Sequence, residues 1–245
     1  MKKTFLLLIL FTVARFSFAQ DTTTTRPTKL EFDLSNRGTD HLLIQFGADS
    51  WMGKPDSIRT KGFSRHFNVY FMLDKPFKTN PKLSVAYGVG IGSSNMFFDN
   101  TYVNLKATGT TNLPFNNVDS ANHFKKFKLT TVYAEVPVEL RWYSNPAEPS
   151  KSFKVAVGAK VGTMLKAYTK GKNLVNKNDV SLYGEKYIQK EVERKFFNGT
   201  KLAVHGRVGY GILGLHAQYQ VTTLIKDGLG PEIRPFSIGL TIAGL

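Results

Sequence analysis

The chain has 245 residues, no Cys, and 33 Lys and Arg against 18 Asp and Glu, which gives a formal net charge of +15. This length suits one large all-β domain or two small ones. Zero Cys excludes a disulfide scaffold, a thiolate metal site, a Cys nucleophile and a lipid-anchored Cys. After the N-terminal segment, no run reaches the ~18 consecutive apolar residues that a transmembrane helix needs. A transmembrane β-barrel is not excluded, because its alternating strands keep the mean hydropathy low.

The N-terminus has the three parts of a secretory signal peptide, which we predict to span residues 1–19. Two lysines form the positive region, residues 5–13 form a short apolar stretch, and Ala19 precedes the expected cut before Gln20. Export argues against cytosolic chemistry with nucleotide cofactors and against nucleic acid as a partner. It favours an anionic membrane surface as the partner of the positive charge.

Residues 20–40 are polar, begin with a threonine run and show no period, which predicts a flexible periplasmic N-terminal segment. Residues 41–245 are predicted to form one barrel domain of eight segments with period-2 alternation. In chain order these segments are His41–Ala48, Phe63–Asp74, Lys82–Phe98, Phe124–Tyr143, Phe153–Lys170, Gly199–Ile212, Leu215–Ile225 and Arg234–Ala243.

The first two segments show the alternation clearly, with Leu42, Ile44 and Phe46 on one face of the first. In the second, apolar residues alternate with residues of the opposite face: Phe67, Val69, Phe71 and Leu73 against His66, Asn68, Tyr70 and Met72. The apolar faces of the segments run over five or six positions, which matches the ~9–11 residues of a tilted strand that crosses a bilayer.

The third and fourth segments each carry an unusual residue type. Gly88, Gly90 and Gly92 lie on the non-apolar face of the third, where they leave room for long side chains from across a lumen. They are not a phosphate loop, because no helix follows them. Pro137 lies inside the fourth segment, and a strand without a free edge would lose a ladder hydrogen bond there. We therefore expect a β-bulge or local kink around residues 136–138.

The connections between the segments alternate between long and short, at about 14, 7, 25, 9, 28, 2 and 8 residues. Outer-membrane barrels have long extracellular loops, short periplasmic turns and an even number of strands. The pattern predicts an all-β fold, an eight-stranded antiparallel up-and-down transmembrane β-barrel. Residues 49–62, 99–123, 171–198 and 226–233 are then expected to face outside.

Aromatic residues gather at several strand ends, which is typical of the girdles at the two membrane interfaces. They are Phe97, Phe98, Trp142, Tyr143, Phe196 and Phe197.

The face that would point into the barrel carries both signs of charge. The predicted lumen residues are Glu135, Glu139, Arg141, Lys154, Lys160, Lys166, His205, Arg207 and His216. An eight-stranded barrel has an interior just wide enough for side chains to fill, so we expect a buried ion-pair network that plugs it. The alternative is a narrow pore that is lined with cations and selects anions.

The sequence gives little support for catalysis. Glu135 and Glu139 are four residues apart on one strand face, roughly 13 Å, which exceeds the ~5–10 Å of a glycosidase pair. The His residues lack metal-ligand spacing. A constellation from Asp49, His66 or His123 at the rim stays open, although nothing in the sequence brings these residues together. We expect no enzyme, no catalytic residue, no cofactor and no metal.

Lysines cluster where the strands would meet the outer membrane surface. They are Lys125, Lys126, Lys128, Lys166, Lys170 and Lys172. Outer-membrane lipids and the phosphates of lipopolysaccharide are the partners we expect for this rim, because anionic headgroups lie at that height.

Several stretches are similar to one family: residues 64–69 (SRHFNV), 74–77 (DKPF), 133–142 (YAEVPVELRW) and 235–240 (PFSIGL). The chain resembles the PorT-like outer-membrane β-barrel proteins of Bacteroidota over most of residues 40–245. The resemblance implies a location in the outer membrane, and some members of the family serve type IX secretion or gliding. It also implies an envelope or secretion protein as a partner.

Three hypotheses of different classes follow. The first is a non-enzymatic outer-membrane barrel with a structural or interaction role. The second is the anion-biased pore. The third is a soluble periplasmic barrel that binds lipid, and it predicts extraction without detergent.

Overall fold

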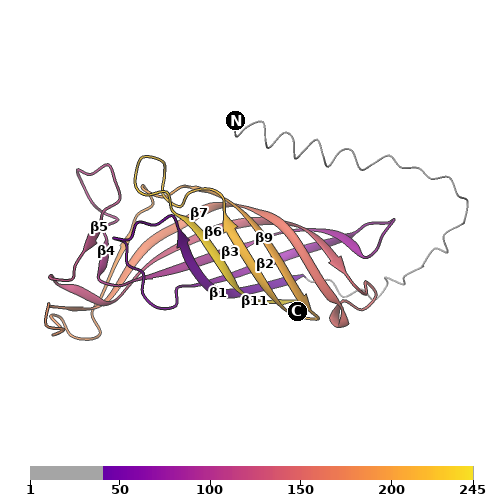
Figure 1. Ribbon diagram of the computed structural model, residues 1–245, viewed down its shortest axis with the longest axis horizontal. Coiled ribbons are helices and arrows are strands. Elements are labelled where there is room, and N and C mark those ends of the chain that lie inside the picture. Colours follow the sequence, from indigo (N-terminus) through magenta and orange to yellow (C-terminus); the bar gives the residue numbers. More distant parts are fainter. Residues whose placement is uncertain (1–40, 245) are drawn as a thin grey trace, which may run out of the picture. The chain divides into compact units, whose positions relative to one another are not determined.

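The computed structural model describes residues 41–244, which fold almost entirely as strands (Figure 1). The predicted signal peptide and the segment 20–40 lie outside the described residues. The long strands are β1 (Leu42–Met52), β2 (Arg65–Pro76), β3 (Leu83–Phe98), β6 (His123–Tyr143), β7 (Phe153–Val175), β9 (Thr200–Tyr210), β10 (Leu213–Gln220) and β11 (Arg234–Ala243). Shorter elements are β4 (Thr101–Val103), β5 (Phe115–Asn117), β8 (Ile188–Val192) and the 3₁₀ turn Pro149–Lys151. No helix within residues 41–244 has the length and apolarity to cross a membrane.

The long strands close into a barrel. One sheet runs in the order β6-β3-β2-β1-β11-β10-β9-β7-β8, and β6 also pairs with β7. All of these pairs are antiparallel, so eight strands form the closed wall while β8 is appended to the outer part of β7. The eight-stranded antiparallel up-and-down barrel predicted from the sequence is confirmed.

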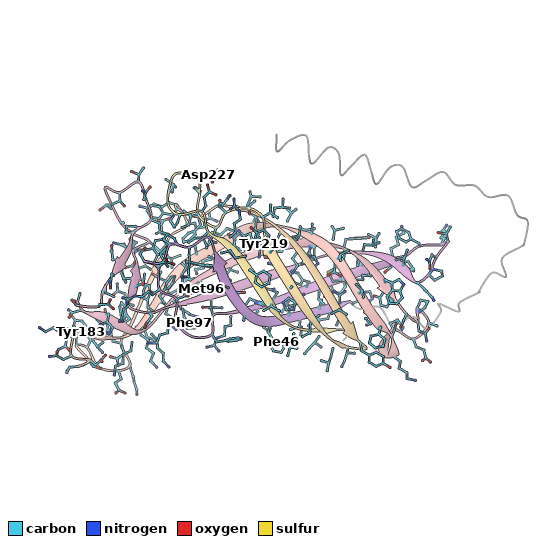
Figure 2. All side chains as sticks on the ribbon, viewed as in Figure 1. Phe46, Met96, Phe97, Tyr183, Tyr219 and Asp227 are labelled. Atoms are coloured by element: carbon cyan, nitrogen blue, oxygen red, sulfur yellow. The ribbon has the colours of Figure 1, made fainter. Side chains whose placement is uncertain are left out.

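The period-2 pattern explains which side chains face outward. In β1, Gln45 is fully buried and its neighbour Phe46 is 41% exposed, and Figure 2 shows Phe46 on the outer surface. The outward positions of the other strands carry the same kind of residue. Examples are Phe67, Phe71, Val89, Ile91, Val136, Val138, Val155, Val157, Val204, Val208, Leu215, Ile238 and Leu240. These side chains form an apolar belt, the surface that a bilayer covers.

The two ends of the barrel differ. The short connections 77–82, 144–152 and 211–212 lie at one end, and the longer connections 53–64, 99–122, 176–199 and 221–233 lie at the other. Figure 1 shows β4 and β5 at this second end, and Figure 2 shows Tyr183 and Asp227 there. We call the packed loops at this end the outer cap.

The outer cap has its own apolar core at the end of the barrel that carries the long loops. This core contains Trp51, Ile58, Met96, Phe98, Val103, Leu105, Leu113, Phe127, Leu129, Tyr133, Met164, Ala167, Phe196, Phe197, Leu224, Ile225 and Ile233. The expected seventh strand continued to Ile225, but β10 ends at Gln220. Leu224 and Ile225 are 2% exposed in the cap core, because the connection turns inward where it can bury them.

The prediction of an aromatic girdle is confirmed only in part. Trp142 is 40% exposed at the short-turn end of β6, where a girdle residue belongs. Phe98, Phe196 and Phe197 pack instead in the cap core, and Tyr143 is 2% exposed on the inward side. A strand end therefore does not by itself place an aromatic side chain at the lipid interface.

The expected bulge around residues 136–138 is wrong. Pro137 pairs with Lys160 in unshifted register on the β7 side. On the β3 side, residues 136 and 137 have no paired residue between the pairs Tyr87↔Val138 and Gly90↔Glu135. The register is the same on both sides of this gap. The missing N–H of proline thus removes a ladder bond, as expected from its chemistry, but the sheet absorbs the loss with no extra residue.

A register shift does occur one strand further on, in β7. Val132 pairs with Lys166 and Tyr133 pairs with Met164, so Leu165 is an inserted residue. Leu165 and Lys166 are consecutive and both exposed. The predicted lumen position of Lys166 is therefore wrong, because the inserted residue turns it outward.

Candidate functional site

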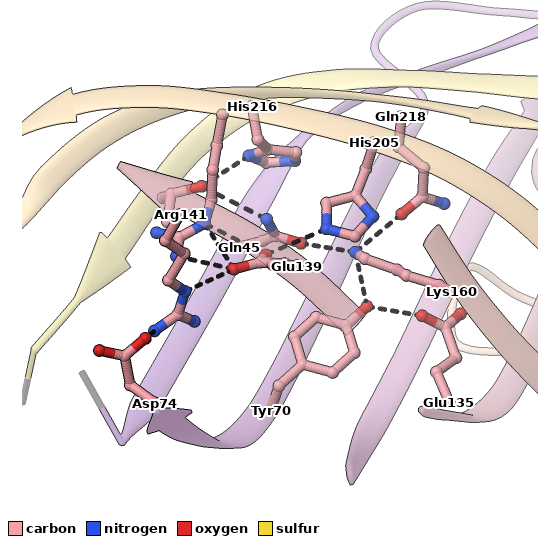
Figure 3. A network of polar contacts seen from close by, with 12 residues as sticks. Gln45, Tyr70, Asp74, Glu135, Glu139, Arg141, Lys160, His205, His216 and Gln218 are labelled. Atoms are coloured by element: carbon pink, nitrogen blue, oxygen red, sulfur yellow. Dashed lines mark hydrogen bonds and ion pairs between the residues drawn. The ribbon is translucent and has the colours of Figure 1, made fainter. Parts of the chain in front are cut away.

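The middle of the barrel is filled by polar side chains that bond to one another (Figure 3). Lys160 of β7 lies at the centre and is fully buried. Its ammonium group donates to Gln45 Oε1 at 3.0 Å, to Tyr70 Oη at 3.0 Å and to Gln218 Oε1 at 2.9 Å. An ammonium group has three donors, so this residue ties β7 to β1, β2 and β10 with all of them.

Glu135 forms one side of this network. Tyr70 Oη donates to Glu135 Oε2 at 2.6 Å, and Lys201 Nζ donates to Glu135 Oε1 at 2.7 Å. The Glu135 side chain is 1% exposed and that of Lys201 is 12% exposed, so the ion pair lies inside the barrel. Gly92 makes room for it, since a Cβ there would lie 2.7 Å from Glu135 Oε1.

Glu139 forms the other side and collects three donors. Arg141 Nε donates to Glu139 Oε2 at 2.8 Å, and Arg207 Nη2 donates to the same oxygen at 2.8 Å. His205 Nε2 is 3.0 Å from Glu139 Oε1, and it is the donor because an ionised carboxylate can only accept. The side chain of Glu139 is fully buried, so its charge is stabilised by these partners and not by water.

A second chain of buried groups runs from Asp49 through two imidazoles. His66 Nδ1 donates to Asp49 Oδ1 at 2.8 Å, and His66 Nε2 is 2.8 Å from His216 Nε2. His216 Nδ1 is 3.0 Å from the Thr241 hydroxyl. Gln45 Nε2 donates to the same hydroxyl, so this chain of groups is connected to the Lys160 network through Gln45. The Ser94 hydroxyl donates to Asp49 and not to an imidazole. Asp49 and His66 are therefore in contact. They do not form a Ser-His-Asp triad, because in a triad the serine hydroxyl bonds to the imidazole.

The polar layer nearly balances its own charge. It contains five cations (Arg141, Lys154, Lys160, Lys201, Arg207) and four acids (Asp49, Asp74, Glu135, Glu139), so 5 − 4 leaves +1. Small cavities lie toward either end of the layer: about 20 Å³ beside Arg141, and about 30 Å³ beside His66 and Lys201. Each has room for one or two waters, and the Lys160 network lies between them.

The structure places the residues of the predicted lumen network as follows. Glu135, Glu139, Arg141, Lys160, His205 and Arg207 meet in the contacts described above, together with His216. Lys154 is also inward, and its ammonium lies 5.7 Å from the centre of the Tyr143 ring. The sequence argument missed the roles of Gln45, Asp49, Tyr70, Asp74, Lys201 and Gln218. Their inward strand parity was the available signal.

Four of the predicted rim lysines form a surface that we call the lysine lattice, together with Lys190 of β8. Lys126 pairs with Lys172 and Lys128 pairs with Lys170 across β6 and β7, and Lys170 also pairs with Lys190 across β7 and β8. Among residues 41–244 none of these five has an acidic partner. Lys128 donates instead to Asn95 Oδ1 at 2.7 Å.

The other two rim lysines lie beside this lattice. Lys166 is exposed on the same outward face of β7, four residues before Lys170. Lys125 is exposed too, but it is the neighbour of Lys126 and therefore faces the opposite side of β6.

His123 begins β6 beside the outer cap, where its Nε2 is 3.7 Å from Asp179 Oδ1. It lines a cavity of about 290 Å³ together with the rings of Tyr102, Phe124 and Phe127. The Tyr102 hydroxyl donates to Glu191 at 2.7 Å and so links β4 to β8. Burial and this hydrogen bond raise the pKa of Tyr102. The long loops are therefore packed together by specific contacts.

Comparison with known proteins gives one family and distant structural likenesses. The family described as outer membrane protein beta-barrel domain matches residues 18–235. Among solved structures, the chain is similar to Ail, the attachment invasion locus protein of Yersinia pestis, in complex with the heparin analogue sucrose octasulfate. The identity is 12%, the TM-score is 0.33, and the match covers 82% of this chain and 94% of that one. Neisserial surface protein A is similar at 14% identity and a TM-score of 0.30, over 82% of this chain and 96% of that one. No curated protein matches the sequence significantly.

Proposed function

The chain belongs to the outer membrane protein beta-barrel domain family, and from this premise we propose a non-enzymatic, non-conducting barrel of the outer membrane. Its role is structural or interactive and is carried by the outer cap and the lysine lattice. The lumen holds the strands together. The alternative of a soluble periplasmic lipid-binding barrel disagrees with the family and with the apolar belt.

The filled lumen is the observation that carries this proposal. Lys160 uses all three of its N–H donors on Gln45, Tyr70 and Gln218, which come from three other strands. An ion that passed through would have to break these bonds and displace a buried ammonium group. Buried polar networks that are mutually satisfied are rigid, so this layer opposes conduction.

Conductance across a planar bilayer tests the proposal. We expect the refolded mature protein to give no steady current steps, under conditions in which a known porin does. Anion-biased steps would contradict it and favour the pore, particularly if Lys160→Met or Arg207→Met reduced the anion bias.

We further propose that the lysine lattice binds the phosphates of lipopolysaccharide. Like charges directly opposite one another on a sheet are destabilising, and Lys126↔Lys172 and Lys128↔Lys170 are two such pairs. The lattice lies on the outer-cap side of the apolar belt, and the proposal puts anionic headgroups at that height. Juxtamembrane lysines gain about 1 kcal/mol each near an anionic surface, which offsets the repulsion.

A matched pair of fourfold variants tests the lattice. Lys126, Lys128, Lys170 and Lys172 would all be changed to Gln, and the control would carry the same change at the exposed Lys78, Lys177, Lys186 and Lys226. We expect the first variant to lose most of its salt-dependent preference for vesicles with lipopolysaccharide over vesicles of phosphatidylethanolamine. Equal behaviour of the two variants would rule out the lattice as the binding surface.

Two finer features of the proposal rest on the sequence alone. We propose cleavage before Gln20 on export, which N-terminal sequencing of the membrane-extracted protein would test; an intact Met1 would contradict it.

We also propose a secretion-associated partner of the PorT-like kind, supported by the resemblance at residues 133–142. Deletion of the gene should then reduce type IX secretion, and an unchanged set of secreted proteins would argue against this role.

A further inference from the structure

The outer cap contains a cavity that the proposed function does not use. Its volume is about 290 Å³, close to the lower end of the ~300–1,000 Å³ of small-molecule sites. One wall comes from the long loop that contains β4 and β5, which Figure 1 shows at the long-loop end of the barrel. The other wall comes from the outer parts of β6, β7 and β8. Long loops of such barrels are extracellular, so the cavity lies on the outer side of the membrane.

Three aromatic rings form the largest part of the apolar lining, and we call them the aromatic platform. They belong to Tyr102, Phe124 and Phe127. The ring centres of Tyr102 and Phe127 are 5.1 Å apart, and those of Phe124 and Phe127 are 5.9 Å apart with planes 15° from parallel. Gly171 of β7 leaves space for the ring of Phe124, since a Cβ there would lie 2.5 Å from it. The Tyr102 hydroxyl donates to Glu191 at 2.7 Å, which fixes the third ring.

Polar residues without a permanent charge line the rest of the cavity. Asn122, His123 and Gln189 are among them. Gln189 Nε2 donates to Glu191 Oε1 at 3.1 Å, which orients the amide while its oxygen remains an acceptor. Among the described residues that line the cavity, none is Lys, Arg, Asp or Glu. The cavity thus offers hydrogen bonds beside an aromatic surface, without a fixed charge.

This combination selects the class of ligand. A fully apolar ligand would leave the polar groups of the lining without partners, which is unfavourable. A phosphate or carboxylate would meet no fixed cation in the cavity, although the lysine lattice is close: the pair Phe124↔Leu174 lies only two residues beyond Lys126↔Lys172. A pyranose ring has both of the required surfaces. Its C–H groups pack on the negative face of an aromatic ring, and its hydroxyls donate and accept hydrogen bonds.

We propose that this cavity binds one neutral pyranose ring of a glycan, which stacks on the aromatic platform and hydrogen-bonds to Asn122 and Gln189. The ring belongs either to the core oligosaccharide of the surrounding lipopolysaccharide or to a free glycan outside the cell, and both present the same chemistry. The site goes beyond the proposed function, because it uses none of the lysines of the lattice and none of the lumen residues.

Saturation-transfer NMR with simple sugars is the first test. The full mature protein, folded in deuterated detergent, would be mixed with the methyl glycosides of glucose, galactose, mannose and N-acetylglucosamine, and separately with glucuronate. We expect at least one neutral glycoside to receive saturation, most strongly at its ring C–H protons, and glucuronate to receive about tenfold less, because its charge has no partner in the cavity. No transfer to any neutral glycoside would overturn the proposal. Equal transfer to glucuronate would assign the binding to surface lysines and would overturn it too.

Two pairs of variants locate the bound sugar. Phe124→Ala removes one ring of the platform, and Phe63→Ala is its control, since Phe63 is 63% exposed and does not line the cavity. Asn122→Ala and Asn112→Ala form the second pair, because both residues are exposed in the same long loop and only Asn122 lines the cavity. We expect each cavity variant to lower the transfer, Phe124→Ala by about tenfold, and each control to keep it. Unchanged transfer in either cavity variant, with a normal gel shift of the folded barrel, would refute the site.

Vesicles distinguish the two sources of the sugar. If the ring comes from the lipopolysaccharide core, vesicles with core-bearing lipopolysaccharide should reduce the transfer to an added glycoside, relative to vesicles of lipid A alone. Equal transfer in the two would identify a free glycan as the source. The fourfold lattice variant should keep the transfer in detergent. A failure of the lattice to bind phosphate would therefore leave this result unchanged, and the two proposals can fail separately.

Discussion

Glu139 is the residue on which the lumen network depends most. Its carboxylate accepts from Arg141, Arg207 and His205, and it is fully buried. Glu139→Gln would take the carboxylate charge away from two buried guanidinium groups, of which Arg141 would keep its ion pair with Asp74 at 3.6 Å. Breaking one partner of a buried pair costs about 3–5 kcal/mol, so we expect the free energy of unfolding to fall by this amount. Urea titration of the protein refolded in vesicles would measure the change.

The same substitution at an exposed glutamate is the control for this prediction. Glu148 lies on the turn before β7, and its side chain is 56% exposed, 3.8 Å from Lys151. Exposed pairs contribute little, so Glu148→Gln should be neutral within about 0.5 kcal/mol. If both variants had the same stability, the network would not hold the barrel together.

Strand β3 depends on glycine at the lumen side, and this gives a prediction at the scale of the element. A Cβ at Gly90 would lie 2.2 Å from the carbonyl oxygen of Val69 and 2.4 Å from the ring of Tyr70. Gly90→Ala must therefore push β3 away from β2 and displace Tyr70 from Lys160. We expect this variant to fail to give the heat-dependent gel shift of a folded barrel.

Gly206 of β9 is the matched control. It lies on the outward side, and a Cβ there meets its nearest atom at 3.7 Å, an ordinary contact. Gly206→Ala should fold like the wild type. A normal gel shift from Gly90→Ala would show that the two strands have more freedom than the close contacts allow.

The loops of the outer cap are linked by a pH-sensitive contact. Arg59 of the first long loop bonds to the Asp119 carboxylate of the second, and this hydrogen bond is the main cause that lowers the pKa of Asp119 below its ordinary value of 3.8. A lowered pKa in the folded state means that the contact stabilises the cap above pH 3.8 and is lost as the pH falls further. We expect faster hydrogen exchange in residues 53–64 below that pH.

Arg59→Gln provides the comparison for this experiment, because it removes the partner at every pH. The variant should show the faster exchange already at neutral pH, after correction for intrinsic rates, with little further change on acidification. An acid response equal to that of the wild type would assign the effect to other groups of the cap.

The strands were predictable where one physical rule decides their sequence. Inside the apolar belt, outward side chains must be apolar and inward ones small or polar, so β11 was placed correctly from Arg234 to Ala243. Beyond the belt this rule ends. The cap buries apolar residues on the inside, so Leu224 and Ile225 looked like a continuing strand. The short strand β8 follows from its pairing with β7, which no local pattern reveals.

The candidate site was predictable to the same degree. Strand parity places Glu139 and Lys160 in the lumen, because both alternate with outward apolar residues. Their partners depend on the register between strands that are distant in sequence. Lys160 contacts Gln45 and Gln218, which are 115 and 58 residues away in the sequence. No sequence pattern gives the register that aligns these strands.

At the scale of the whole molecule, the apolar belt predicts how the barrel tolerates charge. Val136 is 49% exposed in the middle of the outward face of β6, and Phe153 is 60% exposed at the short-turn end of β7. An arginine at the bilayer midplane costs about 2–4 kcal/mol, and one near the interface costs about 0–1 kcal/mol. We expect Val136→Arg to lower the stability in vesicles by the larger amount.

Phe153→Arg is the control, with the same new side chain near the interface. Its stability in vesicles should stay close to that of the wild type. If the two variants were equally stable, the apolar belt would not be the surface in contact with lipid hydrocarbon.

The inserted residue Leu165 has a consequence for how this gene can change. Up to Val161 the odd-numbered residues of β7 face outward, and from Lys166 onward the even-numbered ones do. Loss of the single codon for Leu165 would alter no charge and remove one methyl-bearing side chain. The outer half of the strand would nevertheless keep its faces, because Met164 faces inward and Lys166 outward, so the deletion joins them in regular alternation. A one-codon deletion at Leu165 should therefore be accepted by selection, whereas a one-codon deletion at Ala167 should be rejected, because it would turn Lys170 and Lys172 toward the apolar core of the cap.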